Sequence, residues 1–241
     1  MKLHKKIAKT FGYELIKRKK HPSSNTHLIN LINEYKIDLV IDAGANVGQF
    51  GKMLRAAGYK EEIHSFEPIS TTFIKLMEAI QPDPNWQAYP CALGEALGEI
   101  EVNIMEGSDL SSILPPNEFG KENYKHIKVL DTETVTVRTV ENFLTEDIKD
   151  CAQRRIFLKM DTQGYDLNVF KGAGEKLDFI IGIESEISFM PIYEGMPHYL
   201  ESLKVYEDAG FVITGLYPIS RKNDMAVIEM DCMMLNKRHL L

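Results

Sequence analysis

Two acidic residues and a glycine turn near the start of the chain have the spacing needed to hold a nucleoside. Residues 39–50 read as a buried strand containing Asp42, a turn with Gly44 and Gly48, and the start of a helix. Glycine has no Cβ, so a ligand can approach this backbone, and the following helix presents free N–H groups to an anionic end. Glu67 ends a second apolar segment, where a carboxylate can accept both hydrogen bonds of a ribose diol. The pattern predicts half of a nucleoside-binding α/β fold.

The residue between the two glycines bears on which nucleoside is bound. A dinucleotide site carries the pattern G-x-G-x-x-G, and its second glycine makes room for a pyrophosphate. Asn46 stands at that position, where its side chain crowds a pyrophosphate but can bond a smaller ligand. A nicotinamide oxidoreductase is therefore the weaker alternative. The form D-x-G-x-N-x-G resembles motif I of class I S-adenosylmethionine-dependent methyltransferases.

Several later segments resemble the FkbM-type family of these methyltransferases. They occur in the family's order between residues 38 and 235, and the combination is specific although each alone is not. The family usually has Glu where Asp166 stands and an apolar residue where Thr162 stands. The resemblance implies methyl transfer from S-adenosylmethionine to a hydroxyl, often on a sugar or natural product. The segments are Phe66-Glu67-Pro68, Cys91-Ala92-Leu93-Gly94, Ser111-Ser112, residues 158–166 and residues 191–195.

The cofactor site is expected around the glycine turn and the acidic strand end. The residues from Asp42 to Gly48 should hold the amino-acid end of S-adenosylmethionine, and Glu67 should hold its ribose. The candidate cofactor-binding residues are Asp42, Gly44, Asn46, Gly48, Gln49, Glu67, Pro68 and Ala92.

An alcohol that accepts a methyl group must lose its proton, so the site needs a general base or a metal ion. Asp161 follows an expected strand at 155–160, and Glu184 lies near the end of another at 179–185. Strand ends face the ligand crevice in parallel sheets, so both carboxylates are candidate catalytic residues. Lys159 shares a strand face with Asp161 and is the third candidate. The structural alternatives are that Asp161 caps the helix starting near Asp166 and that Lys159 is an ion partner.

Metal dependence is the less favoured route to the same chemistry. Two carboxylates could hold a divalent cation such as magnesium, with Asp109 as a third candidate ligand, but the chain lacks an Asp-Asp pair. His126 and His198 are alternative bases, although a lone histidine in a loop is more commonly solvated.

Strands alternate with helices along the chain, which predicts a doubly wound, mostly parallel α/β sheet of seven strands. Its last two strands should form a hairpin that adds one antiparallel strand, as in the Rossmann-like class I methyltransferase fold. Two segments of alternating polarity, 99–104 and 134–137, predict half-buried strands, and the polar segment 105–133 between them is expected to be a substrate lid. The expected sheet strands are 38–42, 62–66, 86–91, 155–160, 179–185, 211–217 and 225–235, and the expected helices are 25–35, 49–57 and 70–80.

Composition agrees with one enzyme domain. The 241 residues are 44% hydrophobic and 26% charged, which are ordinary globular values. Three scattered cysteines form no metal or disulfide pattern and favour a reducing cytoplasm. The chain shows neither an apolar run of membrane-spanning length nor a secretory signal. We expect a basic helical extension at 1–24 and a methyltransferase domain at 25–241.

Charge is divided unevenly between these two parts. Residues 1–30 carry eight basic side chains against one acidic one, whereas the rest of the chain has a net charge of −14. An acidic domain is a poor match for nucleic acid. Leu3, Ile7 and Phe11 recur on one expected helix face, which favours packing or a homodimer contact. The alternatives are weak binding to the anionic inner face of a membrane and a partner-docking arm.

The expected partner is a small-molecule or glycan acceptor. A non-catalytic nucleoside-binding module stays an alternative function.

Overall fold

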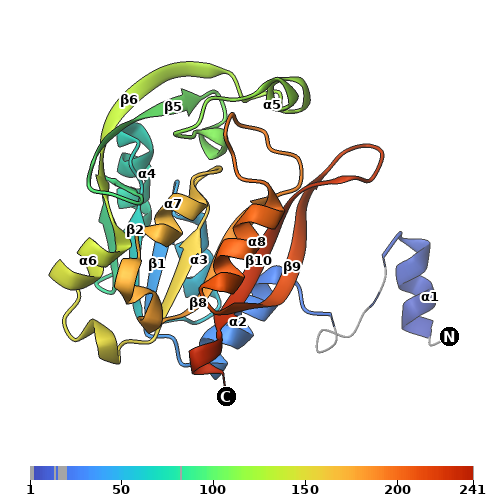
Figure 1. Cartoon of the computed structure of the whole chain (residues 1–241). Helices are drawn as coiled ribbons and strands as arrows, with labels where there is room; N and C mark the ends of the chain where they lie inside the picture. The colour runs from blue at the N-terminus through green and yellow to red at the C-terminus, as the bar shows by residue number, and fades with distance from the viewer. Residues whose placement is uncertain (1–2, 14, 16–20, 82, 241) are drawn as a thin grey trace.

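A seven-stranded sheet forms the centre of the molecule, with strand order β3-β2-β1-β7-β8-β10-β9 (Figure 1). The computed structural model describes residues 3–13, 15, 21–81 and 83–240. Every neighbouring pair is parallel except those that involve β10, which runs antiparallel to β8 and to β9. This confirms the predicted sheet with its antiparallel C-terminal strand. The strands are β1 (Leu39–Ala43), β2 (Glu62–Phe66), β3 (Trp86–Tyr89), β7 (Ile156–Met160), β8 (Ile180–Ser188), β9 (Phe211–Arg221) and β10 (Val227–Asn236).

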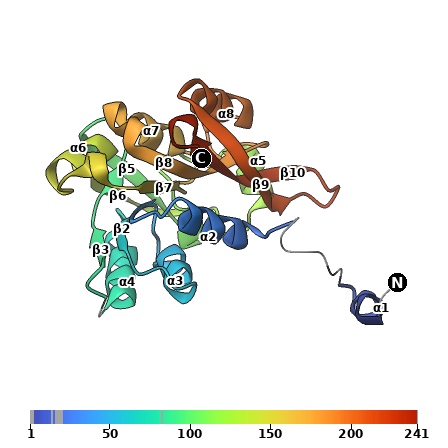
Figure 2. The ribbon, with the colours of Figure 1, turned by 90° about the horizontal axis from the view of Figure 1, so that it is seen from below.

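Helices cover both faces of this sheet. Figure 2 shows α2, α3 and α4 on one face and α6, α7 and α8 on the other. Hydroxyl side chains set two of the helix starts, because Ser23 accepts from the backbone N–H of Thr26 and Thr139 from that of Asn142. The helices are α2 (Ser24–Glu34), α3 (Gln49–Ala56), α4 (Ser70–Ile80), α6 (Val140–Glu146), α7 (Asp166–Lys171) and α8 (Tyr199–Asp208).

The alternation of side chains along the central strands produces two separate hydrophobic cores. Ile41 and Leu158 point to the side of α6, α7 and α8, where they pack with Phe143. Val40 and Phe157, one position away on the same strands, pack on the other side with residues of α2, α3 and α4. A central strand buried on both faces reads as a continuous apolar run, which is why β1 and β7 were evident in the sequence.

A smaller sheet of three strands, in the order β4-β6-β5, lies beside the main one (Figure 1). The sequence predicted the alternating strands but not that they form a sheet of their own, because alternation shows which face is buried and not which strand is the partner. Its strands are β4 (Ala92–Leu93), β5 (Gly98–Met105) and β6 (Val129–Arg138).

The expected lid at 105–133 is shorter and more ordered than predicted. Its last five residues belong to β6, and the remainder contains η1 (Ser108–Leu110) and α5 (Glu118–Asn123). It packs on the loop after β8, where Ile127 shares an apolar cluster with Ile192, Tyr193 and Met196. The other short helices are η2 (Cys151–Gln153), η3 (Gly174–Phe179) and η4 (Lys237–His239).

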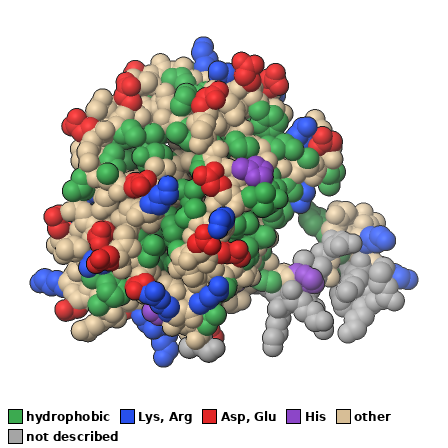
Figure 3. All heavy atoms as spheres, in the orientation of Figure 1, with side chains coloured by type: hydrophobic (Ala, Val, Ile, Leu, Met, Phe, Trp, Pro, Cys, Tyr) green, Lys and Arg blue, Asp and Glu red, His purple; other side chains and the backbone are tan. Residues whose placement is uncertain are grey.

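The N-terminal helix α1 (Leu3–Thr10) stands away from the sheet in both ribbon views. Its large apolar side chains Leu3 and Ile7 are 74% and 53% exposed, and Phe11, directly after the helix, is 74% exposed. Lys2, Glu14 and the basic run 17–20 of the predicted extension lie outside the described residues. Figure 3 shows acidic and basic side chains interspersed over the described part of the face seen in Figure 1. Among the described helices, none combines the length and the apolar character that crossing a membrane requires.

Removal of residues 1–22 should leave the domain intact, because the apolar side chains of α1 lose little buried area. We expect the free energy of unfolding in urea to change by less than about 0.5 kcal/mol. Size-exclusion chromatography and sedimentation with anionic vesicles would separate the two predicted roles. Loss of a dimer supports the packing role, and loss of salt-sensitive vesicle binding supports the membrane role. A large loss of stability would contradict the exposed placement of α1.

Candidate functional site

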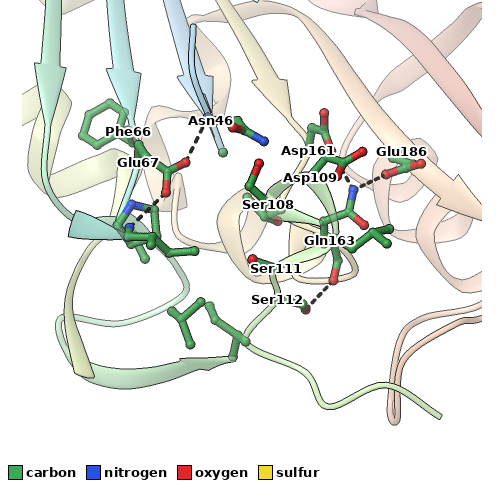
Figure 4. A pocket seen from close by; sticks show the side chains of 18 of the residues that line it. Asn46, Phe66, Glu67, Ser108, Asp109, Ser111, Ser112, Asp161, Gln163 and Glu186 are labelled. Carbon is green, nitrogen blue, oxygen red and sulfur yellow. Dashed lines mark hydrogen bonds between the residues drawn. The ribbon is translucent and has the colours of Figure 1, made fainter. Parts of the chain in front are cut away.

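A cavity of about 400 Å³ lies at the carboxyl ends of the parallel strands (Figure 4). The main sheet, the smaller sheet and the segment 108–113 all contribute to it. Among its described lining residues, six are acidic and none is Lys, Arg or His. The polar and charged ones include Asn46, Gln49, Glu67, Ser108, Asp109, Ser111, Ser112, Tyr124, Asp161, Gln163, Glu186, Ser220, Glu229 and Asp231.

The turn after β1 forms one wall, and only glycine fits at its first position. Gly44 has φ of 74°, and a Cβ there would lie 2.0 Å from the backbone oxygen of Asp161. Asn46 also adopts a left-handed conformation, with φ of 48°. Its side-chain oxygen Oδ1 is buried and has no hydrogen-bond partner within the described chain. The turn therefore presents bare backbone at Gly44 and an unused acceptor at Asn46.

Glu67 is held rigidly at the end of β2. Its Oε2 accepts from the backbone N–H of Asn46 and its Oε1 from that of Ile69, both at 2.9 Å (Figure 4). The side chain is 5% exposed, and burial raises the pKa of its carboxyl to about 7. Each oxygen keeps a second lone pair, so the oriented carboxylate can still accept two hydroxyl groups of a ligand.

The structure divides the predicted cofactor residues into two groups. Gly44, Asn46, Gln49, Glu67, Pro68 and Ala92 line the cavity, whereas Asp42 and Gly48 do not.

The two residues outside the lining support the turn from behind. Asp42 is fully buried, and its carboxylate lies 3.1 Å from the Lys159 ammonium and accepts from the Ser65 hydroxyl, also at 3.1 Å. Gly48, with φ of 80°, is the residue before α3 and its N-cap, and a Cβ there would press against Leu76 and Trp86. The expectation that these two residues face the ligand is therefore not met, because their contacts are with the protein core.

Asp161 follows β7 and lies directly against the glycine turn. Its backbone N–H donates to the Ala43 oxygen at 3.2 Å, which joins the end of β7 to the end of β1. Its carboxylate accepts from the Gln163 amide at 3.1 Å and lies 3.5 Å from the Lys159 ammonium. The side chain is 45% exposed, so the carboxylate is oriented by the protein and open to the cavity.

Lys159 itself does not line the cavity. Its ammonium donates to the Gly44 oxygen at 3.1 Å and pairs with Asp42 and Asp161. Burial opposes the charge, but the two carboxylates outweigh it and raise the pKa of Lys159. The contacts match the alternative interpretation, an ion partner beneath the site.

The structure places Glu186, not Glu184, at the cavity. The predicted strand ended at residue 185, whereas β8 continues to Ser188, so Glu184 lies inside the sheet beside Lys159 of β7 and Met233 of β10. Burial raises the pKa of Glu184 to about 8, which favours the protonated form of its carboxyl. Glu184 therefore does not line the cavity, contrary to the expectation. Glu186, two residues further along the same strand face, lines it instead.

Gln163 connects the acids on this side of the cavity. It has φ of 52°, and its amide nitrogen donates to Asp161 and to Glu186, both at 3.1 Å (Figure 4). Its side-chain oxygen accepts from the Tyr193 hydroxyl at 3.0 Å, and its backbone oxygen accepts from Ser112 at 2.7 Å. The sequence analysis gave Gln163 no role of its own, although the segments that contain Gln163, Ser112 and Tyr193 had been singled out.

The turn after β7 is capped by Asp166 and not by Asp161. The Asp166 carboxylate accepts from the backbone and hydroxyl of Thr162 at 2.8 and 2.6 Å. It also accepts from the Ser185 hydroxyl at 2.9 Å. Because Asp166 satisfies the turn, Asp161 is left free for another role.

Two further acids on β10 were missed by the sequence reasoning. Glu229 is 4% exposed, and its Oε2 accepts from the hydroxyls of Tyr124 and Ser220 at 2.9 and 3.0 Å. Burial raises the pKa of Asp231 to about 6. These residues lie far along the chain from the recognised motifs, so only the folded hairpin brings them to the cavity.

The remaining candidates have less direct positions. His126 is 67% exposed at its side chain, lies 3.3 Å from Glu106, and does not line the cavity, and neither does His198. Asp109 does line it. In the part of the chain that the structure describes, His, Cys, Asp and Glu side chains form no group of three or more that could hold a metal ion.

Comparison with known proteins gives a family match over most of the chain. The family model described as "Methyltransferase FkbM domain" matches residues 42–213. Methyltransferase sdnD from Sordaria araneosa is 24% identical over 211 residues, which cover 78% of this chain and 79% of that protein.

Solved methyltransferase structures are similar at low identity. An rRNA methylase from Streptococcus thermophilus is 12% identical with a TM-score of 0.47, covering 92% of this chain and 98% of that one. Magnesium protoporphyrin IX methyltransferase from Synechocystis, solved with bound SAM, is 9% identical with a TM-score of 0.45, covering 89% and 78%.

Gly44→Ala should destabilise the protein, because the new methyl group meets the Asp161 carbonyl in a left-handed conformation. Strain of about 1–2 kcal/mol and overpacking of about 1–3 kcal/mol should both appear in the free energy of unfolding. Gly58→Ala is the matched control, since Gly58 has φ of 95° but nothing within 4 Å of a Cβ. Urea unfolding of both variants measures the difference, and equal losses would show that the close approach at Gly44 is not a constraint.

Proposed function

The chain belongs to the FkbM methyltransferase family, and from this premise we propose that it moves a methyl group from S-adenosylmethionine to a hydroxyl of a sugar, glycan or natural product. The observation that carries the proposal is one cavity with Glu67 on one side and Asp161 at the glycine turn (Figure 4). The family match disfavours the nicotinamide oxidoreductase and the non-catalytic binding module that the sequence left open.

The cavity residues fit S-adenosylmethionine. The Glu67 carboxylate, fixed by two backbone N–H groups, would accept the two ribose hydroxyls. Bare backbone at Gly44 and the unpartnered Oδ1 of Asn46 would bind the amino-acid end. Apolar lining near Phe66 and Leu93 would cover the adenine base.

Asp161 is the residue best placed to act as general base. S-adenosylmethionine, when bound, supplies a methyl group activated on a sulfonium. The Asp161 carboxylate would accept the proton of the acceptor hydroxyl as that oxygen is methylated. Gln163 and Lys159 hold the carboxylate in one orientation from two sides. The Ser112 hydroxyl donates to the Gln163 backbone oxygen and so ties the segment 108–113, which lines the cavity, to the turn after β7.

The Glu67→Ala variant should bind S-adenosylmethionine roughly tenfold more weakly or worse, because it loses charge-assisted hydrogen bonds of about 1.5–3 kcal/mol each. Isothermal titration calorimetry measures this change. Tight binding of NAD without binding of S-adenosylmethionine would contradict the assignment of the cofactor.

The pH dependence of the same affinity provides the control for charge. Only an ionised carboxyl accepts both hydroxyls, and the pKa of Glu67 is raised to about 7. Affinity should therefore fall as the pH drops below about 7, and Glu67→Gln should remove this part of the pH dependence. A wild-type affinity that stays constant from about pH 6 to about pH 8, one unit on either side of that pKa, would contradict the role of the carboxylate.

Asp161→Asn keeps the shape of the side chain but removes its charge. We expect turnover to fall by roughly 10²- to 10⁴-fold with little change in cofactor affinity, since Asp161 should contact the acceptor oxygen. Radiolabelled methyl transfer measures the turnover, and calorimetry measures the affinity. Unchanged turnover would remove Asp161 from the mechanism and direct attention to Glu186. Loss of activity with EDTA and recovery with magnesium would instead make Asp161 a metal ligand.

A further inference from the structure

The end of the cavity formed by β7, β8 and β10 is strongly acidic. Asp161, Glu186, Glu229 and Asp231 all line it, and no described lining residue carries a positive side chain. The nearby Lys159 lies beneath the turn, where Asp42, Asp161 and the Gly44 oxygen already bind its ammonium. Figure 4 shows Glu186 on the side of the cavity opposite Glu67. The four acids, called here the acidic end, are therefore separate from the proposed ribose contact.

One buried oxygen of the acidic end has no hydrogen-bond partner among the described residues. Glu229 uses its Oε2 for the hydroxyls of Tyr124 and Ser220, while its Oε1 is buried without a hydrogen bond. The residue is 4% exposed and borders the cavity. A buried carboxylate oxygen without a donor is costly, so a ligand that donates a hydrogen bond here gains more than one that does not.

The titration of the acidic end points in the same direction. Burial raises the pKa of Glu186 well above its ordinary value, and the neighbouring Glu229 and Asp161 raise it further. Burial also raises the pKa of Glu229, with a contribution from Asp161. Both carboxyl groups are therefore costly to ionise in the cavity without a ligand, and a cation bound beside them would stabilise their charged forms. A phosphate or carboxylate on the acceptor would be repelled, whereas a cation would be attracted.

We propose that the methyl acceptor is an amino alcohol, such as an amino sugar, whose protonated amine binds the acidic end. Its ammonium donates hydrogen bonds to Glu229 Oε1 and Glu186, and its hydroxyl reaches Asp161. This inference rests on the proposed methyl transfer and specifies its substrate class. An ammonium group suits the acidic end because it offers three donors to carboxylates that now receive only neutral ones.

The test is a binding comparison on enzyme saturated with S-adenosylhomocysteine. Amino sugars and amino alcohols, glucosamine among them, are titrated by calorimetry beside their N-acetylated forms, together with glucose, glucose 6-phosphate and magnesium chloride alone. At least one amine should bind roughly tenfold or more tightly than its N-acetylated form, as expected for one charge-assisted hydrogen bond. Amines that bind no better than their N-acetylated forms, or preferred binding of the phosphate or of magnesium alone, would overturn the proposal.

Two variants then place the effect on the acidic end. Glu229→Gln and Glu186→Gln should each lower the affinity for the amine roughly tenfold while leaving that for its N-acetylated form unchanged. Glu122→Gln, on the exposed surface of α5, removes the same charge outside the cavity. It should change neither the affinity for the amine nor that for its N-acetylated form. An amine preference that survives both variants contradicts the assignment.

The affinity for S-adenosylmethionine distinguishes this inference from the proposed function. If Glu229→Gln weakens cofactor binding as much as amine binding, the acidic end serves the cofactor and the inference fails. If the wild-type protein binds no S-adenosylmethionine, the proposed function fails first. Intact methyl transfer or cofactor binding with no preference for amines overturns only the substrate class.

Discussion

The buried ammonium of Lys159 is the contact on which the arrangement of the site depends. It pairs with Asp42 of β1 at 3.1 Å, with Asp161 at 3.5 Å, and it donates to the Gly44 carbonyl at 3.1 Å. One charge thus connects the central strand, the glycine turn and the candidate base. Removal of one partner from such a buried pair leaves an uncompensated charge, which typically costs about 3–5 kcal/mol. The cavity wall and its carboxylate are therefore kept in place together.

Carboxyl groups at this site serve different purposes because their surroundings differ. Glu67 receives two backbone N–H groups, which fix its orientation at the cavity. Asp166 receives three donors from Thr162 and Ser185 and acts as a structural cap. Asp161 is half exposed and receives the Gln163 amide. Glu229 is buried with one oxygen unpartnered, which makes it sensitive to what enters the cavity. Burial and partners, rather than residue type, assign these roles.

The comparison of Glu184 with Glu186 shows where sequence reasoning about the site reached its limit. Both carboxylates lie on the same strand face, and a pattern of period two cannot say how far a strand continues. The strand runs to Ser188, so Glu186 lines the cavity and Glu184 lies inside the sheet beside Lys159. In the same way, the alternating strands β5 and β6 were recognised, but their pairing in a separate sheet was not. The end of a strand and the partner of a strand both depend on distant parts of the chain.

Local sequence was sufficient for the features that local chemistry controls. The strands β1 and β7 are apolar throughout because both of their faces are buried. The turn carries Gly44 because its backbone needs a positive φ. The position of Glu67 follows from the spacing of the first two strands. Tertiary structure alone decided the acidic end of the cavity. Glu229 and Asp231 come from a hairpin that only chain folding places beside β8, and their pKa values rise because that packing removes water from them. Position along the chain cannot show this, since desolvation depends on neighbours that are remote in sequence.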